Sequence, residues 1–148
     1  MDNTTLIDQA KIVLADTFVM YMKAHSYHWN VIGPNFPQLH DFFGNLYEEL
    51  HGAIDPLAEH IRALDSFAPA TLVRMSDLST IKEDEKIPTT ENMIRNLIDA
   101  NEKVMNTLVL ARQKAEVAEM YGYVNFLEER IMIHAKHRWM LKAIAEKK

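Results

Sequence analysis

Apolar residues recur at intervals of three and four along four long segments of the chain, a spacing typical of amphipathic helices. The first segment covers about residues 5–29 and the second about residues 37–64. Between them, Gly33 and Pro37 interrupt the pattern, and Pro37 also suits the first turn of a new helix. Pro56 lies inside the second segment, but the apolar period continues on both sides of it. We therefore expect one helix there, kinked at the proline.

A connector of about residues 65–88 follows, with a possible short helix near residues 71–78. It is too long for a tight turn between helices, so it is expected to cross the bundle. A third helix comes after it, and a fourth covers about residues 118–145, with Ala135 and Trp139 among its inward candidates. Four long amphipathic helices with one long crossover predict an all-α, ferritin-like four-helix bundle.

The length of the chain, 148 residues, suits a single domain over residues 1–148 with a substantial core. There is no cysteine, so neither a disulfide framework nor a thiolate metal site can form. We see no secretory signal and no uninterrupted apolar stretch of the length needed to span a membrane. A soluble cytoplasmic protein without a membrane partner is expected.

The chain is acidic, with a formal net charge of −5 when histidines are neutral. This charge is compatible with attracting cations, but it is not the basic footprint of a protein that binds a phosphate backbone. The C-terminal segment adds only Lys142, Lys147 and Lys148. Such a tail supports weak, salt-sensitive contacts, so we expect DNA binding to be weak or absent.

Candidate metal ligands gather in the first two helices. His28 ends the first helix and His40 lies in the first turn of the second. Asp55 and Glu59 are four residues apart further along the second helix, so both project from one face. Imidazole and carboxylate ligands suit iron, and also manganese or zinc. The plain alternatives are structural histidines at helix ends and an ordinary solvated carboxylate pair.

The distance between the two pairs is a difficulty. His40 and Asp55 are 15 residues apart on one helix, which at the helical rise corresponds to about 22 Å. They cannot bind one metal within a single chain. Either they belong to different sites, or a twofold-related subunit brings its carboxylates to the histidines of this one. Spacing alone does not choose between these arrangements.

A metal site inside the bundle, of the di-iron type, is a further possibility. Glu48-x-x-His51 is the kind of pair from which such sites are built, but a second pair on another helix is required. The residues three before His134 and His137 are not glutamate. Solvated helix surface is therefore the simpler interpretation of Glu48 and His51. For Trp29, the simpler interpretation is a core residue.

Residues 28–36 (HWNVIGPNF), Leu39-His40 and residues 55–59 (DPLAE) resemble the signature of the Dps family. The segment that includes Glu129-Arg130 and His134 looks like the last helix of that family, so the resemblance spans nearly the whole chain. It is specific, because tryptophan, histidine and glycine fall at fixed offsets within a loop that helical periodicity does not dictate.

The resemblance implies a homo-oligomeric shell of twelve ferritin-like subunits that stores iron and protects against oxidative damage. It implies ferroxidase activity, in which hydrogen peroxide or dioxygen oxidises Fe(II) at sites between twofold-related subunits. His28 and His40 would come from one subunit, and Asp55 and Glu59 from its partner. Glu59 could bridge two irons. This arrangement would remove the distance problem.

One position departs from the family. Dps proteins usually have an acidic residue one turn after the second histidine, and here that residue is Gly44. One tightly bound metal with a weak second one is the hypothesis that follows. The alternative is a Dps-like structural or DNA-associated shell with a weakened ferroxidase centre. A third possibility, a bacterioferritin-like or rubrerythrin-like enzyme, is disfavoured because the second Glu-x-x-His pair is missing.

Overall fold

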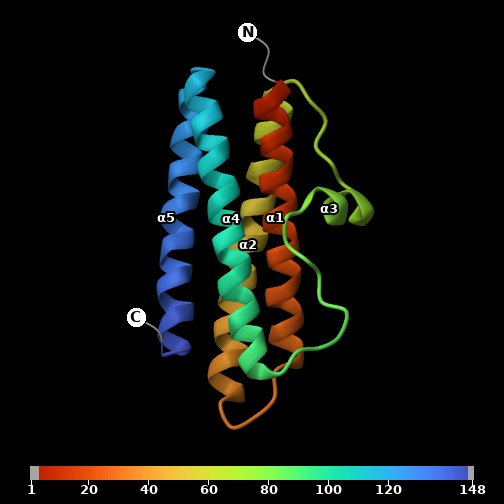
Figure 1. Cartoon of the computed structure of the whole chain (residues 1–148), viewed down its shortest axis with the longest axis vertical. Coiled ribbons are helices and arrows are strands. Elements are labelled where there is room, and N and C mark those ends of the chain that lie inside the picture. The colour runs from red at the N-terminus through yellow and green to blue at the C-terminus, as the bar shows by residue number, and fades with distance from the viewer. Residues whose placement is uncertain (1–3, 147–148) are drawn as a thin grey trace.

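The computed structural model describes residues 4–146, and these residues form five helices without a strand (Figure 1). The four long helices match the predicted segments to within a few residues, and the short helix lies in the crossover as expected. The prediction of an all-α, ferritin-like bundle is confirmed. The helices are α1 (Thr4–Asn30), α2 (Phe36–Ala63), α3 (Leu72–Leu78), α4 (Thr90–Val117) and α5 (Tyr121–Ile144).

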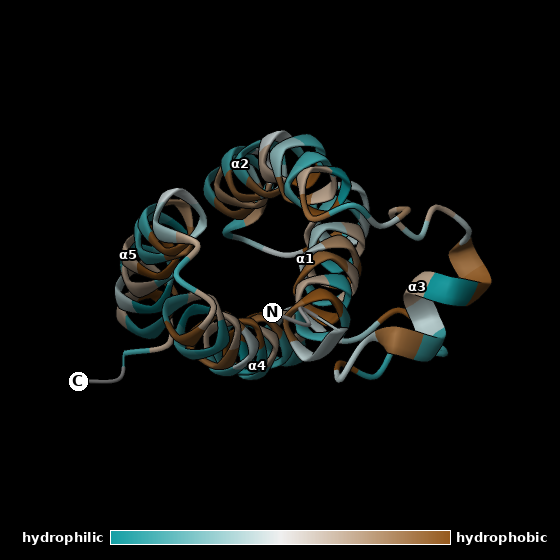
Figure 2. Ribbon diagram, turned by 90° about the horizontal axis from the view of Figure 1, so that it is seen from above, coloured by the Kyte–Doolittle hydropathy of each residue, from teal (hydrophilic) through white to brown (hydrophobic). Residues whose placement is uncertain are grey.

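The crossover sets the topology. α1 and α2 form one antiparallel pair, and α4 and α5 form another (Figure 1). Because the crossover runs the length of the bundle, α2 and α4 point in the same direction. α1 packs against α2 and α4, and α5 packs against α4. Seen from above, the four long helices surround the core and α3 lies outside, beside α1 (Figure 2).

The core consists of apolar side chains from all four long helices. Among the fully buried ones are Met20 of α1, Leu50 of α2, Leu97 of α4 and Leu127 of α5. Burying such a side chain contributes roughly 1.5–3 kcal/mol, so these stripes account for most of the favourable packing energy. No helix among residues 4–146 has the length and apolar character needed to cross a membrane.

Three residues that the sequence analysis placed in the interior are exposed in the structure. Trp139 and Ala135 of α5, both inward candidates, are exposed, and Trp29 of α1 is exposed rather than part of the core. The α5 stripe is shifted, because polar residues take inward positions that the hydrophobic pattern gave to other residues. Both tryptophans are more than 60% exposed, which leaves large apolar surfaces on a single subunit.

Hydrogen bonds to α1 hold the crossover in place. The fully buried carboxylate of Asp16 accepts bonds from the hydroxyl of Ser79 (2.7 Å) and from the amide (2.6 Å) and hydroxyl (2.8 Å) of Thr80. Further along, Asp84 accepts bonds from Lys23 and Tyr27. These contacts satisfy a buried carboxylate and fix the connector along the outer side of α1.

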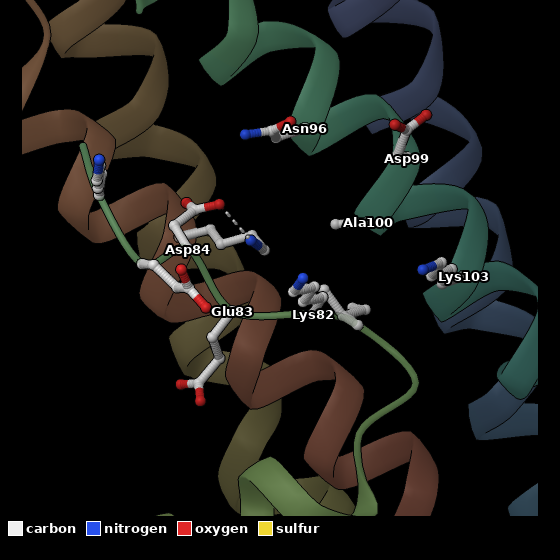
Figure 3. Close-up of a pocket in the computed structure, with 11 residues that line it drawn as sticks. Lys82, Glu83, Asp84, Asn96, Asp99, Ala100 and Lys103 are labelled. Atoms are coloured by element: carbon white, nitrogen blue, oxygen red, sulfur yellow. Dashed lines mark hydrogen bonds and ion pairs between the residues drawn. The ribbon is translucent and has the colours of Figure 1, made fainter. Parts of the chain in front are cut away.

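A pocket of about 470 Å³ lies between this part of the crossover, α1 and α4 (Figure 3). The dashed line in Figure 3 marks the ion pair between Asp84 and Lys23. Asp99 and Lys103 of α4 line the opposite side. Both basic and acidic side chains line the pocket, and none of the four predicted metal ligands is among them.

Candidate metal centre

The turn between α1 and α2 brings His28 and His40 side by side. Gly33 has a φ of +118°, a conformation that glycine adopts without strain and other residues rarely adopt. The amide of Phe36 donates to the carbonyl of Gly33 (3.1 Å), and Pro37 occupies the start of α2. The breaker residues of the sequence therefore fold the chain back tightly enough to place the last turn of α1 against the first turns of α2.

The two imidazoles are stacked, with ring centroids 3.8 Å apart and planes inclined by 17°. The Nδ1 atom of His28 lies 2.7 Å from the carbonyl oxygen of His40, and the Nδ1 atom of His40 lies 2.6 Å from the carbonyl oxygen of His28. A carbonyl oxygen only accepts, so each Nδ1 carries the donated hydrogen. In the neutral rings this leaves both Nε2 lone pairs for a metal ion, with the orientation of each ring fixed by a backbone partner.

Gly44 lies directly beside the first histidine. A β-carbon at this position would be 3.1 Å from both the Cε1 and the Nδ1 atoms of His28. A pocket of about 400 Å³ opens next to the ring, and its lining includes Asp41, Tyr47 and Glu48. The side of His28 that faces α2 is therefore reached through a depression with two carboxylates at its edge.

The predicted carboxylates lie far from the histidines within one subunit. Asp55 and Glu59 are both exposed, and α2 continues through Pro56 without interruption. The helical rise therefore separates Asp55 from His40 by about 22 Å along the axis. Among residues 4–146 no group of three or more histidines, aspartates and glutamates is close enough to hold a metal ion. Each subunit brings the histidine pair together and keeps it apart from the carboxylate pair, and the ligand roles stay predictions.

Aromatic side chains surround the histidine pair on the outer face of α1 and α2. His25 stacks on Tyr47, with centroids 3.9 Å apart and planes inclined by 5°, and its Nδ1 atom lies 2.9 Å from the hydroxyl oxygen of Tyr21. The exposed Trp29 contacts His25, with centroids 4.1 Å apart. Burial lowers the pKa of His25, and the charges of the nearby His28 and His51 lower it further.

A second polar cluster lies inside the bundle, between α2, α4 and α5. The carboxylate of Glu49 accepts hydrogen bonds from the guanidinium of Arg130 and from Nε2 of His137 (2.7 Å). Arg130 also donates to Nε2 of His134 (3.1 Å), whose Nδ1 donates to the side-chain oxygen of Asn101 (2.7 Å). A buried guanidinium repels other cations, so this network agrees with the sequence-based argument against an in-bundle metal site.

Burial and hydrogen bonding shift the pKa values of two members of this cluster. His134 is fully buried, and burial, followed by the charge of Arg130, lowers its pKa well below the ordinary value. Burial alone would raise the pKa of Glu49, but the hydrogen bonds from His137 and Arg130 and the charge of Arg130 outweigh burial and lower that pKa to about 2. His134 is therefore neutral and Glu49 ionised at neutral pH.

These pKa shifts predict an acid-sensitive contribution to stability. Because the pKa of Glu49 is lower in the folded than in the unfolded state, its stabilisation is complete above the unfolded value of 4.5 and is lost as the pH falls towards about 2. The thermal midpoint of wild type should exceed that of Glu49→Gln at pH 7, and the gap should narrow between pH 5 and pH 2. A gap that stays constant over this range would contradict the assignment.

Sequence reasoning missed this cluster, although a signal was present. Leu127, Arg130, His134, His137 and Leu141 follow one another at intervals of three and four, and all five are buried on the same face of α5. Polar residues that continue an apolar stripe in this way indicate a buried network.

Comparison with known proteins defines the class first. A family model described as a ferritin-like domain matches residues 7–148. A DNA protection during starvation protein of Brevibacillus brevis is 34% identical over 133 residues, which are 90% of this chain and 89% of the relative.

Solved structures narrow the class. The crystal structure of a Dps protein from Bacillus brevis superposes with a TM-score of 0.92 at 30% identity, covering 98% of this chain and 99% of the other. The crystal structure of a Dps protein from Vibrio cholerae O1 superposes with a TM-score of 0.92 at 26% identity, covering 97% of this chain and 90% of the other. That protein is described as a member of a broad superfamily of ferritin-like diiron-carboxylate proteins. The chain belongs to the Dps family of the ferritin-like superfamily.

Proposed function

We propose that this protein stores iron and protects the cell from oxidative damage by oxidising Fe(II) to Fe(III). Each chain forms a single domain, and twelve of them assemble into a hollow cytoplasmic shell. The observation that carries the proposal is the His28–His40 pair, because both Nδ1 atoms donate to backbone carbonyls and both Nε2 atoms are left for a metal ion. Membership of the family and the description of a relative as a ferritin-like diiron-carboxylate protein support it.

The proposed site needs two subunits. His28 and His40 of one subunit supply neutral ligands, and Asp55 and Glu59 of a twofold-related subunit supply two negative charges that offset the charge of the ion. The geometry within one subunit supports this division, because Asp55 lies about 22 Å from His40 along α2 and Glu59 lies one turn further away. Zinc or manganese could occupy the same ligands, since imidazole and carboxylate do not select strongly among these metals.

The oxidation itself requires two electrons for each peroxide. Two Fe(II) ions each give up one electron, and hydrogen peroxide takes both electrons and two protons to form two water molecules. The carboxylates of Asp55 and Glu59 stabilise the higher charge of the Fe(III) product more than that of Fe(II), which favours electron loss. Dioxygen is the alternative oxidant. Because Gly44 supplies no ligand, one ion binds tightly and the second binds weakly.

Anaerobic addition of ferrous iron followed by hydrogen peroxide, monitored by absorbance, tests the proposal. We expect rapid formation of Fe(III) by the purified wild type, well above the rate of a protein-free solution, and one tight ferrous ion per proposed site. Light scattering on the same sample should give the mass of twelve subunits. Oxidation at the protein-free rate would overturn the ferroxidase proposal, and two equally tight ions per site would overturn the assignment of Gly44 as a missing ligand.

A further inference from the structure

A centre that holds a single iron lacks one electron for the reduction of hydrogen peroxide. Peroxide takes two electrons, whereas one Fe(II) ion gives up one. Because residue 44 is glycine and supplies no ligand, the proposed centre binds its second ion weakly, and peroxide meets a single ion whenever iron is scarce. Without another electron donor, the reaction is Fe²⁺ + H₂O₂ → Fe³⁺ + HO• + HO⁻. The hydroxyl radical that it releases is the damage that the proposed function prevents.

Two tyrosines lie on the face of α1 and α2 that carries the histidine pair. Tyr47 of α2 is the nearer one, with its ring centroid 5.2 Å from that of His28. Tyr21 of α1 lies next to it, with the two tyrosine centroids 6.2 Å apart. Both rings are half-buried. A phenol gives up an electron readily only when its proton leaves in the same step, because a phenol radical cation is a strong acid. The position of a proton acceptor therefore decides which ring can act as a donor.

Among residues 4–146, only one of these two hydroxyl groups has such an acceptor. The hydroxyl oxygen of Tyr21 lies 2.9 Å from Nδ1 of His25, which is one turn further along α1. The Nδ1 atom of a neutral imidazole that carries its hydrogen on Nε2 accepts this bond and is a base for the phenolic proton. Tyr47 instead lies flat against the face of the same imidazole, with centroids 3.9 Å apart and planes inclined by 5°. His25 thus presents its basic edge to Tyr21 and its face to Tyr47.

We propose that Tyr21 supplies the second electron when a single Fe(II) ion occupies the centre, and that His25 takes its proton. This inference rests on the proposed ferroxidase function. The electron passes from Tyr21 past Tyr47 to the centre, and the phenolic proton moves to Nδ1 of His25. The balance is Fe²⁺ + H₂O₂ + Tyr–OH + His → Fe³⁺ + HO⁻ + HO⁻ + Tyr–O• + His–H⁺. Iron and the phenol each lose one electron, peroxide gains both, and no hydroxyl radical is released.

The chain offers a matched pair of variants for this donor. Tyr21→Phe and Tyr47→Phe each remove one phenolic oxygen from this face and keep the aromatic ring. If distance to His28 decided the donor, the radical would be lost in Tyr47→Phe. If the proton acceptor decides it, the radical is lost in Tyr21→Phe. His25→Phe keeps a ring beside Tyr47 and removes the acceptor.

The experiment uses assembled shells loaded anaerobically with one Fe(II) ion per proposed site. They are mixed with one equivalent of hydrogen peroxide and frozen for electron paramagnetic resonance, while a spin trap in a parallel sample reports hydroxyl radical. We expect wild type and Tyr47→Phe to give a radical signal that changes when the tyrosine rings are deuterated, with little trapped hydroxyl radical. Tyr21→Phe and His25→Phe should lose this signal and release trapped hydroxyl radical, although Fe(III) forms in all four proteins.

Three results would overturn the inference and leave the ferroxidase function standing. They are a tyrosyl signal that survives Tyr21→Phe, a radical that tyrosine deuteration does not change, and the absence of any protein radical in wild type while Fe(III) forms. Absence of Fe(III) in wild type would instead overturn the proposed function. Oxidation of metal-free shells by photogenerated tris(bipyridine)ruthenium(III) then tests the donor alone, and a tyrosyl signal that is the same in wild type and Tyr21→Phe would overturn the role of Tyr21.

Discussion

Shells that contain both His40→Ala and Glu59→Ala chains should regain about one quarter of the wild-type rate of Fe(II) oxidation, although shells of either variant alone should be no faster than a protein-free solution. With random pairing, half of the twofold interfaces contain one chain of each kind. In such an interface one of the two sites combines intact histidines with intact carboxylates, and the other lacks both His40 and Glu59.

This expectation follows from the separation of the two ligand pairs. His28 and His40 lie at the turn between α1 and α2, and Asp55 and Glu59 lie exposed on either side of Pro56, further along α2. A site within one chain cannot be rebuilt by mixing damaged chains, whereas a site between chains can. Recovery of activity is therefore a direct test of a shared site.

The chains are co-expressed, purified as mixed shells through two different tags, and assayed by absorbance after anaerobic iron loading and peroxide addition. His28→Ala mixed with His40→Ala is the matched control, because both variants damage the histidine half and no pairing restores an intact site. Recovery in this control, or no recovery in the first mixture, would refute the division of ligands between subunits.

Much of the fold could be predicted because it depends on periodicity and on a few breaker residues. The four stripes defined the long helices, and the length of the connector defined the crossover. Gly33 and Pro37 marked the turn that brings His28 to His40. These features act locally along the chain, so a single sequence contains them.

Other features of the site depend on side-chain packing across helices, which periodicity does not encode. The sequence showed that Gly44 lacks a ligand atom, but not that the ring of His28 occupies its place. It paired His28 and His40 by resemblance, but not through their reciprocal Nδ1 bonds to each other's carbonyl oxygen. Those contacts depend on ring rotamers, which only the folded arrangement fixes.

The exposed tryptophans show a related limit. Trp29 was given a core role and Trp139 an inward one, because large apolar side chains are usually buried. In one subunit both are exposed. A helical stripe identifies which residues share a face, but it does not say whether that face meets the core of the same chain or another surface.

Glu49→Gln should lower the free energy of unfolding by about 2 kcal/mol. Removing one partner of a fully buried ion pair costs about 3–5 kcal/mol, and the value is smaller here because the side chain of Glu49 is 30% exposed. The neutral amide leaves the buried guanidinium of Arg130 without a counter-charge. It also weakens the hydrogen bond from His137, so two buried donors lose their charged acceptor.

The measurement is the thermal midpoint of the assembled protein at pH 7, where a loss of this size corresponds to roughly 4–8 °C. Glu128→Gln is the control, because Glu128 pairs with Arg112 at an exposed position and Glu116 remains to bind the same guanidinium. Its midpoint should change by less than about 2 °C, since exposed pairs contribute little. Equal changes in the thermal midpoint for the two variants would contradict the stabilising role assigned to Glu49.

The same variant should also lose stability in one particular part of the molecule. α2 and α5 are joined in the bundle interior through Glu49 and its partners, and further along by His60, which lies beside Tyr123 and Phe126. In Glu49→Gln, amide hydrogen exchange should therefore increase first in α5 around Arg130, while the α1–α2 turn that carries His28 and His40 keeps its protection. Uniform loss of protection over all helices would mean that the cluster stabilises the fold as a whole rather than the contact between these two helices.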